Sequence, residues 1–195
     1  MGEYGPGCIL TASGRFFDPI RPDPALIVLE DIGHALGNIC RFTGHCRRPY
    51  SVAEHVMLGA MFVPEEHLLA WLMHDASEAY LGDVSSPLKR WLGMKDYRWS
   101  ERHLQGVICG KFGVRDQHPR IVTEVDERML ATEMRDLMPE RAREFFASWH
   151  FPEPFDFTIS SAPDLCIDWG LPWVMSVTEL LVAREVAREV LSNEA

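Results

Sequence analysis

Between two proline-rich stretches, apolar residues recur at helical spacing through almost the whole chain. The prolines fall in residues 18–24 and 152–163, where the fixed φ and the missing N–H of proline disfavour a helix. Alternating strand patterns are scarce, and residues 7–17 and 155–159 are predicted to be short ribbons or plain loops. The sequence therefore predicts an all-α fold, a single-domain helical bundle. The predicted helices span residues 29–41, 51–63, 64–81, 86–91, 96–112, 119–138, 141–149 and 173–191.

Length and composition favour one globular domain over residues 1–195. Of these residues, 47% are hydrophobic and 25% are charged, and a chain of this size can bury a core without disulfides. The five cysteines form no Cys-x-x-Cys pair, which favours a reducing compartment. Residues 169–178, the longest uncharged stretch near the C-terminus, are too few for the roughly 18 apolar residues of a membrane span. We expect a cytoplasmic protein with no membrane partner.

The net charge limits the class of ligand. A formal charge of −10 repels polyanions at long range, so duplex DNA or RNA is not expected as the main partner. A small phosphorylated ligand, held by a local group of arginines, remains compatible with this charge.

Polar residues interrupt the apolar faces of three predicted helices. Ser51 and Glu54 form a capping box at the start of one helix, and His55 follows within its apolar stripe. Asp126 interrupts the apolar face of helix 119–138 in the same way. A lone histidine or aspartate on such a face is more often a hydrogen-bonded core residue or a solvated one. Each of these residues alone therefore says little about function.

The dipeptide His74-Asp75 is expected inside helix 64–81. Glu78 follows at i+4 from the histidine and i+3 from the aspartate, so three ionisable groups would share one face of an otherwise apolar helix. Burying them without partners would be costly. Two histidines and two aspartates on three helices are a ligand set that suits a divalent ion in a helical bundle, which makes His55, His74, Asp75 and Asp126 candidate metal ligands.

The order of these four residues resembles the H…HD…D pattern of the HD-domain metal-dependent phosphohydrolases. Residues 50–55 (YSVAEH) and 74–89 (HDASEAYLGDVSSPLK) are similar to motifs of the small 5′-deoxynucleotidases in that family. Residues 40–45 (CRFTGH) are similar to a stretch of its compact members, among them the phage dATP triphosphohydrolases. The resemblance covers roughly residues 29–137.

This resemblance implies an HD-type bundle whose four ligands hold a divalent ion, Mn, Co, Zn or Mg. Asp75 and Glu78 would be the catalytic carboxylates, and Glu78 would deprotonate the attacking water or protonate the leaving oxygen. Asp83 corresponds to a carboxylate that contacts the 3′-hydroxyl of a deoxyribose, and Arg41 to an arginine that binds phosphate. Phe42 would stack on the sugar or base, or else be a core aromatic.

Several cations surround the predicted site and suit a polyphosphate. The resemblance implies a small-molecule deoxynucleotide as the substrate, and these cations favour a dNTP, from which triphosphate would be released. Three alternatives stay open: a 5′-deoxynucleotidase that acts on dNMPs, a nucleotide phosphodiesterase, and a nucleotide-binding module without turnover. Helix 173–191 could supply the face of a homo-oligomer. The surrounding cations are Arg41, His45, Arg47, Arg48, Lys89 and Arg90.

Overall fold

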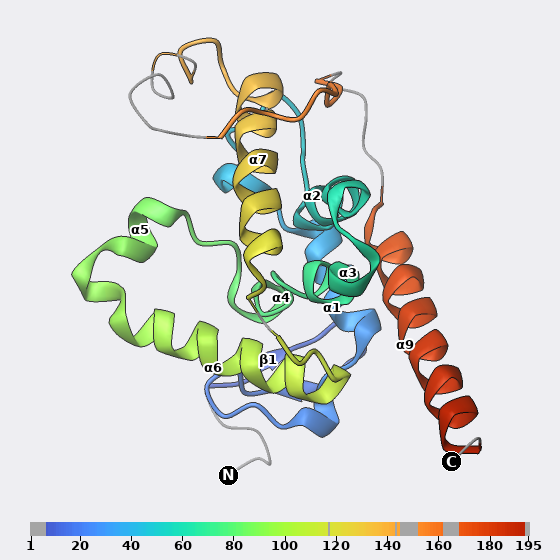
Figure 1. Ribbon diagram of the computed structural model, residues 1–195. Helices are drawn as coiled ribbons and strands as arrows, with labels where there is room; N and C mark the ends of the chain where they lie inside the picture. Colours follow the sequence, from blue (N-terminus) through green and yellow to red (C-terminus); the bar gives the residue numbers. More distant parts are fainter. Residues whose placement is uncertain (1–6, 117, 143, 145–151, 162–167, 194–195) are drawn as a thin grey trace.

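Helices build most of the structure, a computed structural model that describes residues 7–116, 118–142, 144, 152–161 and 168–193 (Figure 1). The predicted all-α class is confirmed. The predicted helix 141–149 lies largely outside the described residues. The α-helices are α1 (Leu29–Asn38), α2 (Val52–Gly59), α3 (Glu65–Leu72), α4 (Glu78–Leu81), α5 (Ser86–Arg90), α6 (Lys95–Phe112), α7 (Arg120–Leu137) and α9 (Gly170–Asn193).

One short ribbon is the extent of the sheet structure in the described ranges. Strands β1 (Ile9–Leu10) and β2 (Phe16–Phe17) pair antiparallel, with Ile9 opposite Phe17. The segment 155–159 forms no strand. The first of the two predicted ribbons is therefore present, and the second is a loop. Single 3-10 turns occur at Pro24–Leu26, Arg41–Gly44, Ala60–Phe62 and Leu92–Met94.

Helix α7 runs through the middle of the molecule, with α9 along one side and α5 and α6 on the other (Figure 1). The core includes the fully buried Trp71, Met129 and Trp173. The indole N–H of Trp173 in α9 donates to the carbonyl of Leu72, 2.7 Å away, and so anchors α9 at the end of α3. A Cβ on Gly33 of α1 would lie 2.4 Å from a Val174 methyl group, so glycine permits this close approach of α1 and α9. No helix among the described residues combines the length and apolarity that a membrane span requires.

The first helix is shorter than predicted, and this brings Arg41 to the start of α2. Helix α1 ends at Asn38 because the next residues pair with the chain ahead of α2 instead of continuing the helix. The Arg41 N–H donates to the carbonyl of Tyr50 at 2.9 Å, and the Val52 N–H to that of Ile39 at 3.0 Å. Residues 41 and 50 are thereby held side by side, and the loop between them projects from this pair.

Helix α2 begins as the capping motif predicts. The Ser51 hydroxyl accepts the backbone N–H of Glu54 at 3.1 Å. The Glu54 side chain does not complete the capping box, because its carboxylate binds the guanidinium of Arg48 at 2.7 and 2.9 Å. The α-helix ends at Gly59 and continues as a 3-10 turn to residue 62. The position of the predicted helix 51–63 is therefore confirmed, and its last turn is a 3-10 turn.

The predicted helix 64–81 is broken in two, so the expectation that His74, Asp75 and Glu78 share one helix face is wrong. Helix α3 ends at Leu72 and α4 begins at Glu78, with tight turns between them. A side chain from another helix occupies the break. Gln105 in α6 binds both backbone groups that would form the helical hydrogen bond between residues 73 and 77.

Candidate metal centre

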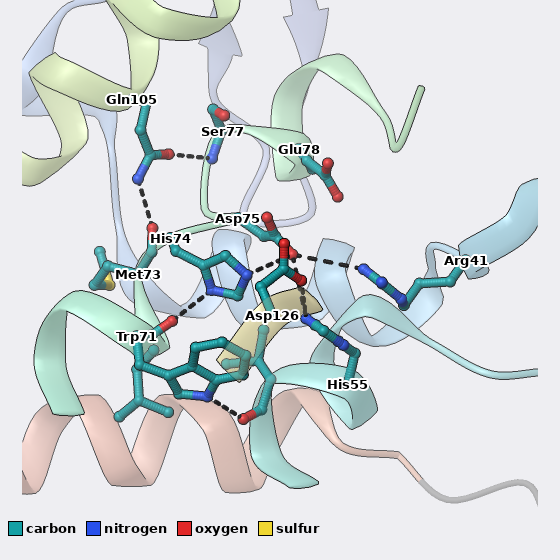
Figure 2. Close-up of polar contacts among 12 residues, drawn as sticks. Arg41, His55, Trp71, Met73, His74, Asp75, Ser77, Glu78, Gln105 and Asp126 are labelled. Carbon is teal, nitrogen blue, oxygen red and sulfur yellow. Dashed lines mark hydrogen bonds and ion pairs between the residues drawn. The ribbon is translucent and has the colours of Figure 1, made fainter. Parts of the chain in front are cut away.

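His55 from α2 meets His74 and Asp75 from the turn that follows α3 (Figure 2). One ligand atom from each residue lies within 4.8 Å of the other two. The Nε2 atoms of His74 and His55 are 3.2 and 3.9 Å from Asp75 Oδ2. Two imidazole nitrogens and a carboxylate oxygen therefore converge on one point, and this cluster could hold a metal ion.

The hydrogen bonds of the two histidines leave their Nε2 atoms free. His55 Nδ1 lies 2.5 Å from Glu133 Oε1, and His74 Nδ1 lies 2.6 Å from the carbonyl oxygen of Trp71. Both Nε2 atoms are buried and have no hydrogen-bond partner among the described residues. Metal-binding histidines typically use their second nitrogen in this way, bonded to a carboxylate or a carbonyl. The donor set therefore fits a divalent ion.

Asp126 approaches the same point from α7. Its Oδ1 lies 3.3 Å from His55 Nε2. Burial opposes ionisation of this carboxyl, but the adjacent His55 and the charges of His74 and Arg41 lower its pKa below the usual range. An ionised Asp126 adds a second carboxylate oxygen beside the cluster. The structure thus gathers His55, His74 and Asp75 in one cluster and places Asp126 against His55 of that cluster.

Glu133 is a central residue that the sequence reasoning missed. Its side chain is fully buried, about two turns along α7 from Asp126, and accepts hydrogen bonds from Arg41 at 3.0 and 3.2 Å and from the Tyr50 hydroxyl at 2.9 Å. Burial opposes its charge, but Arg41 and His55 outweigh that effect and lower the pKa of Glu133. The available signal was its position at i+7 from Asp126, which places both residues on one face of the helix.

The same contacts act on His55. Burial and the charge of Arg41 act to lower the pKa of His55, but Glu133 and Asp126 outweigh them and raise it to about 9. The imidazole is therefore attractive to any cation, a proton or a metal ion, at its Nε2.

Arg41 faces the cluster through a contact that was not predicted. Its guanidinium is held by Glu133, and its Nη1 lies 3.8 Å from Asp75 Oδ2. Figure 2 shows the side chain reaching toward Asp75. Phe42 is partly exposed next to it, with the guanidinium carbon 5.7 Å from the ring centre. A positive charge thus stands beside the candidate ligands, where an anion bound to the cluster would meet it.

Glu78 lies at the edge of the cluster with one oxygen free. Lys89 Nζ donates to Glu78 Oε1 at 3.3 Å and also contacts Glu101 at 2.6 Å. Glu78 Oε2 is buried and has no hydrogen-bond partner in the described part of the chain. Burial, followed by the charges of Asp75 and Asp83, raises the pKa of Glu78 well above its usual range. This carboxyl therefore holds a proton more readily than an ordinary glutamate does.

A pocket of about 210 Å³ adjoins the cluster on this side. Arg102 and His118, which the sequence reasoning did not single out, belong to its wall. Together they offer cationic or hydrogen-bonding groups opposite the carboxylates. Other residues on the wall include His74, Asp75, Glu78 and Lys89.

The remaining predicted contacts are spread more widely. Asp83 is partly buried, and burial raises its pKa against the opposing charge of Arg41. His45 and Arg47 are exposed, and the Arg47 N–H binds the carbonyl of Leu137, roughly 16 Å along α7 from Asp126. Arg48, expected as a cation for a polyphosphate tail, is instead buried against Glu54. Fewer cationic side chains therefore lie near the cluster than the sequence predicts.

Two curated proteins resemble this chain, and no protein-family model matches it. The Escherichia coli K12 protein named "Uncharacterized protein YfdR" is 45% identical over 131 residues, which cover 66% of this chain and 71% of YfdR. An uncharacterized protein of Rhodobacter capsulatus is 37% identical over 111 residues, which cover 52% of this chain and 56% of that protein. Neither name states an activity, so the chemistry must be argued from the residues themselves.

Proposed function

The chain belongs to the same family as Escherichia coli YfdR, and we propose that it is a metal-dependent phosphohydrolase of 2′-deoxynucleoside 5′-phosphates with a bundle of HD type. The order His55, His74-Asp75, Asp126 and the motifs around it resemble those of HD-domain phosphohydrolases. This proposal assigns a catalytic role to the metal centre described above.

One observation carries the proposal. The imidazoles of His55 and His74 are fixed through Nδ1, and their buried Nε2 atoms face the carboxylate of Asp75. A histidine that served only the core would have both nitrogens satisfied, because an unpaired buried polar atom costs roughly 1–3 kcal/mol. A bound cation would satisfy both nitrogens at once. The cost of leaving them unpaired therefore supports a ligand-binding role.

His55, His74, Asp75 and Asp126 would hold the ion. When bound, a divalent ion supplies a water of lowered pKa and polarises a phosphoryl oxygen. Arg41 would bind the anionic oxygens of the substrate beside Asp75, because a guanidinium matches phosphate oxygens in charge and geometry. No covalent nucleophile from the chain is needed for this chemistry.

Glu78 would move the proton. Because its pKa is raised well above the usual range, its carboxyl holds a proton more readily than an ordinary glutamate and would donate it to the leaving oxygen as the bond to phosphorus breaks. For a dNTP, the oxygen of water bonds to the α-phosphorus, the bond from phosphorus to O5′ breaks, and the deoxynucleoside leaves with the proton. Triphosphate is the second product. Asp83 would accept the 3′-hydroxyl of the sugar.

A dNTP is the favoured substrate because the pocket beside the cluster includes Lys89, Arg102 and His118 on its wall, and these can meet a phosphate tail. A dNMP is the second candidate, and one observation favours it. Arg48 is paired with Glu54, and Lys89 already contacts two carboxylates, which leaves fewer cations for a triphosphate.

Product analysis tests the proposal. The protein is incubated with dNTPs, dNMPs, the matching ribonucleotides and cyclic nucleotides in Mn²⁺, Co²⁺, Mg²⁺ or Zn²⁺, and the products are separated by chromatography. Tripolyphosphate with a deoxynucleoside supports the dNTP reaction, and orthophosphate from dNMPs alone supports the nucleotidase. Opening of a cyclic nucleotide indicates a phosphodiesterase. The absence of turnover with every substrate and metal would overturn the proposal.

A further inference from the structure

Helix α3 stops one residue short of the two candidate ligands His74 and Asp75, and a side chain from another helix occupies the break. We propose that Gln105 of α6 is a positioning residue that holds the chain open between Met73 and Ser77 and so directs these two ligands toward His55. The effect on the metal rests on the proposed function, whereas the opening of the helix does not.

The contacts of Gln105 replace a specific backbone hydrogen bond. In a continuous helix the N–H of Ser77 would donate to the carbonyl of Met73, four residues earlier. Instead, Gln105 Nε2 donates to the Met73 carbonyl at 2.6 Å, and the Ser77 N–H donates to Gln105 Oε1 at 3.0 Å. Figure 2 shows the amide lying between the two backbone groups. Gln105 is itself buried, with 5% of its surface exposed.

This break decides where the ligands point. Adjacent residues of an α-helix do not face each other, so a continuous helix would direct His74 and Asp75 apart. In the observed turn the His74 N–H binds the Trp71 carbonyl at 3.2 Å, and the Ala76 N–H binds that of Met73 at 3.1 Å. Where the chain leaves the regular helix in this way, His74 Nε2 lies 3.2 Å from Asp75 Oδ2. Both ligands then face His55 across a short gap.

The amide of glutamine suits this role because it offers one donor and one acceptor at the same distance along the side chain. With Gln105 in place, neither the Met73 carbonyl nor the Ser77 N–H is left unpaired in the core. An apolar side chain at 105 would leave the Ser77 N–H without a partner, and the Met73 carbonyl with the Ala76 N–H alone, unless the two groups bonded to each other. Bonding to each other restores the helical turn and displaces the ligands.

The test compares Gln105→Met with Ser100→Ala. Methionine keeps the length of the side chain and removes both hydrogen bonds. Ser100 is a matched control because it is also buried on α6, but its hydroxyl binds only its own helix, at the Asp96 carbonyl. Gln105→Glu, which keeps an acceptor for the Ser77 N–H, is measured in parallel in case the methionine variant does not fold.

Two measurements are made on each protein. NMR Cα chemical shifts of residues 74–77 in metal-free protein report the helix, and titration with Co²⁺ reports metal affinity. For Gln105→Met we expect shifts toward helical values and a Co²⁺ affinity reduced by roughly 10- to 100-fold, as for other residues that orient metal ligands. Gln105→Glu should fall between this variant and the wild type. Ser100→Ala should match the wild type in both measurements.

The two measurements separate the failure of this inference from the failure of the proposed function. Unchanged shifts in the Gln105 variants would show that the amide does not hold the helix open and would overturn the inference. Helical shifts with undiminished Co²⁺ affinity would overturn the positioning role. Helical shifts in the variants of a protein whose wild type binds no Co²⁺ would leave the helix opening supported and overturn the metal centre.

Discussion

Glu133 Oε1 lies 2.5 Å from Nδ1 of His55, although 78 residues separate the two in the sequence. Both side chains are fully buried. Because this carboxylate accepts a hydrogen bond from Nδ1, the neutral imidazole of His55 has its lone pair on Nε2, where the other candidate ligands are. The carboxylate also holds Arg41 and Tyr50, so one buried charge links the core of the bundle to the metal centre.

Replacing Glu133 with glutamine should therefore affect both stability and metal binding. Glutamine preserves the shape of the side chain but removes the charge that pairs with Arg41 at 3.0 Å, and leaves that guanidinium with the more distant Asp75. We expect the free energy of unfolding in urea to fall by roughly 3–5 kcal/mol. We also expect metal affinity to fall by roughly 10- to 100-fold.

Glu124→Gln is the matched control on the same helix. Glu124 pairs with Arg120 at the surface, four residues away, and an exposed pair of this kind contributes about 0.3–0.5 kcal/mol. Equal losses of stability in the two variants would show that Glu133 has no special place in the fold.

Asp75→Ala should remove both metal and activity. Asp75 Oδ2 is the oxygen that approaches both free imidazole nitrogens, and alanine offers no donor in its place. Elemental analysis of metal-loaded protein and the turnover assay measure the two effects. Asp96→Ala, which removes an exposed aspartate from the first turn of α6, should keep both. Full metal content in Asp75→Ala would exclude this residue as a ligand.

Glu78→Gln should keep the metal and lower kcat by roughly 10²- to 10⁴-fold, because the amide retains the shape but cannot transfer the proton. The pKa of Glu78 is raised, so in the wild type its protonated form is present below that pKa and is lost as the pH rises through it. We therefore expect kcat of the wild type to decline on the alkaline side. A pH profile of kcat checks this, and an unaltered rate in Glu78→Gln would make the residue structural.

Arg102→Gln should discriminate between substrates. Arg102 lies on the wall of the pocket that would hold the phosphate tail of a dNTP. If it binds that tail, its loss removes a charged hydrogen bond of about 1.5–3 kcal/mol and lowers kcat/KM for the dNTP by roughly 10- to 100-fold. The value for a dNMP, which has no tail to contact, should change little. Arg120→Gln removes the same charge from the surface of α7 and should change neither value. Equal losses for both substrates would argue against a tail in this pocket.

The helical class and most helix positions could be predicted because they depend on local patterns. Apolar spacing locates α1, α6 and α7, and the Ser51 cap fixes the start of α2. The cluster of His55, His74 and Asp75 could be predicted for a related reason, since polar residues on apolar faces require an explanation. Such patterns belong to short segments of sequence. They can be recognised without knowing which segments are in contact in the folded protein.

The break after α3 could not be predicted, because its cause is 28 residues away in sequence from Ser77. Residues 73–81 have good helical character, but the amide of Gln105 binds two of their backbone groups. The role of Glu133 was hidden in the same way, since its three partners come from distant segments. The prediction for Arg48 was wrong in the opposite direction. It was expected to bind phosphate, but its guanidinium is buried against Glu54. Contacts between segments decide all three cases.

The loop that follows Arg41 has a backbone conformation that lowers stability but holds Arg41 in place. Phe42 and Thr43 both have φ near +54°, in the left-handed region that costs most residues other than glycine about 1–2 kcal/mol each. Selection for heat resistance alone would replace them with glycine, which adopts this conformation freely but also many others. The guanidinium beside Asp75 would then be carried on a looser backbone. Variants selected in the laboratory for a higher melting temperature should therefore carry glycine at these two positions and hold Arg41 less firmly beside Asp75.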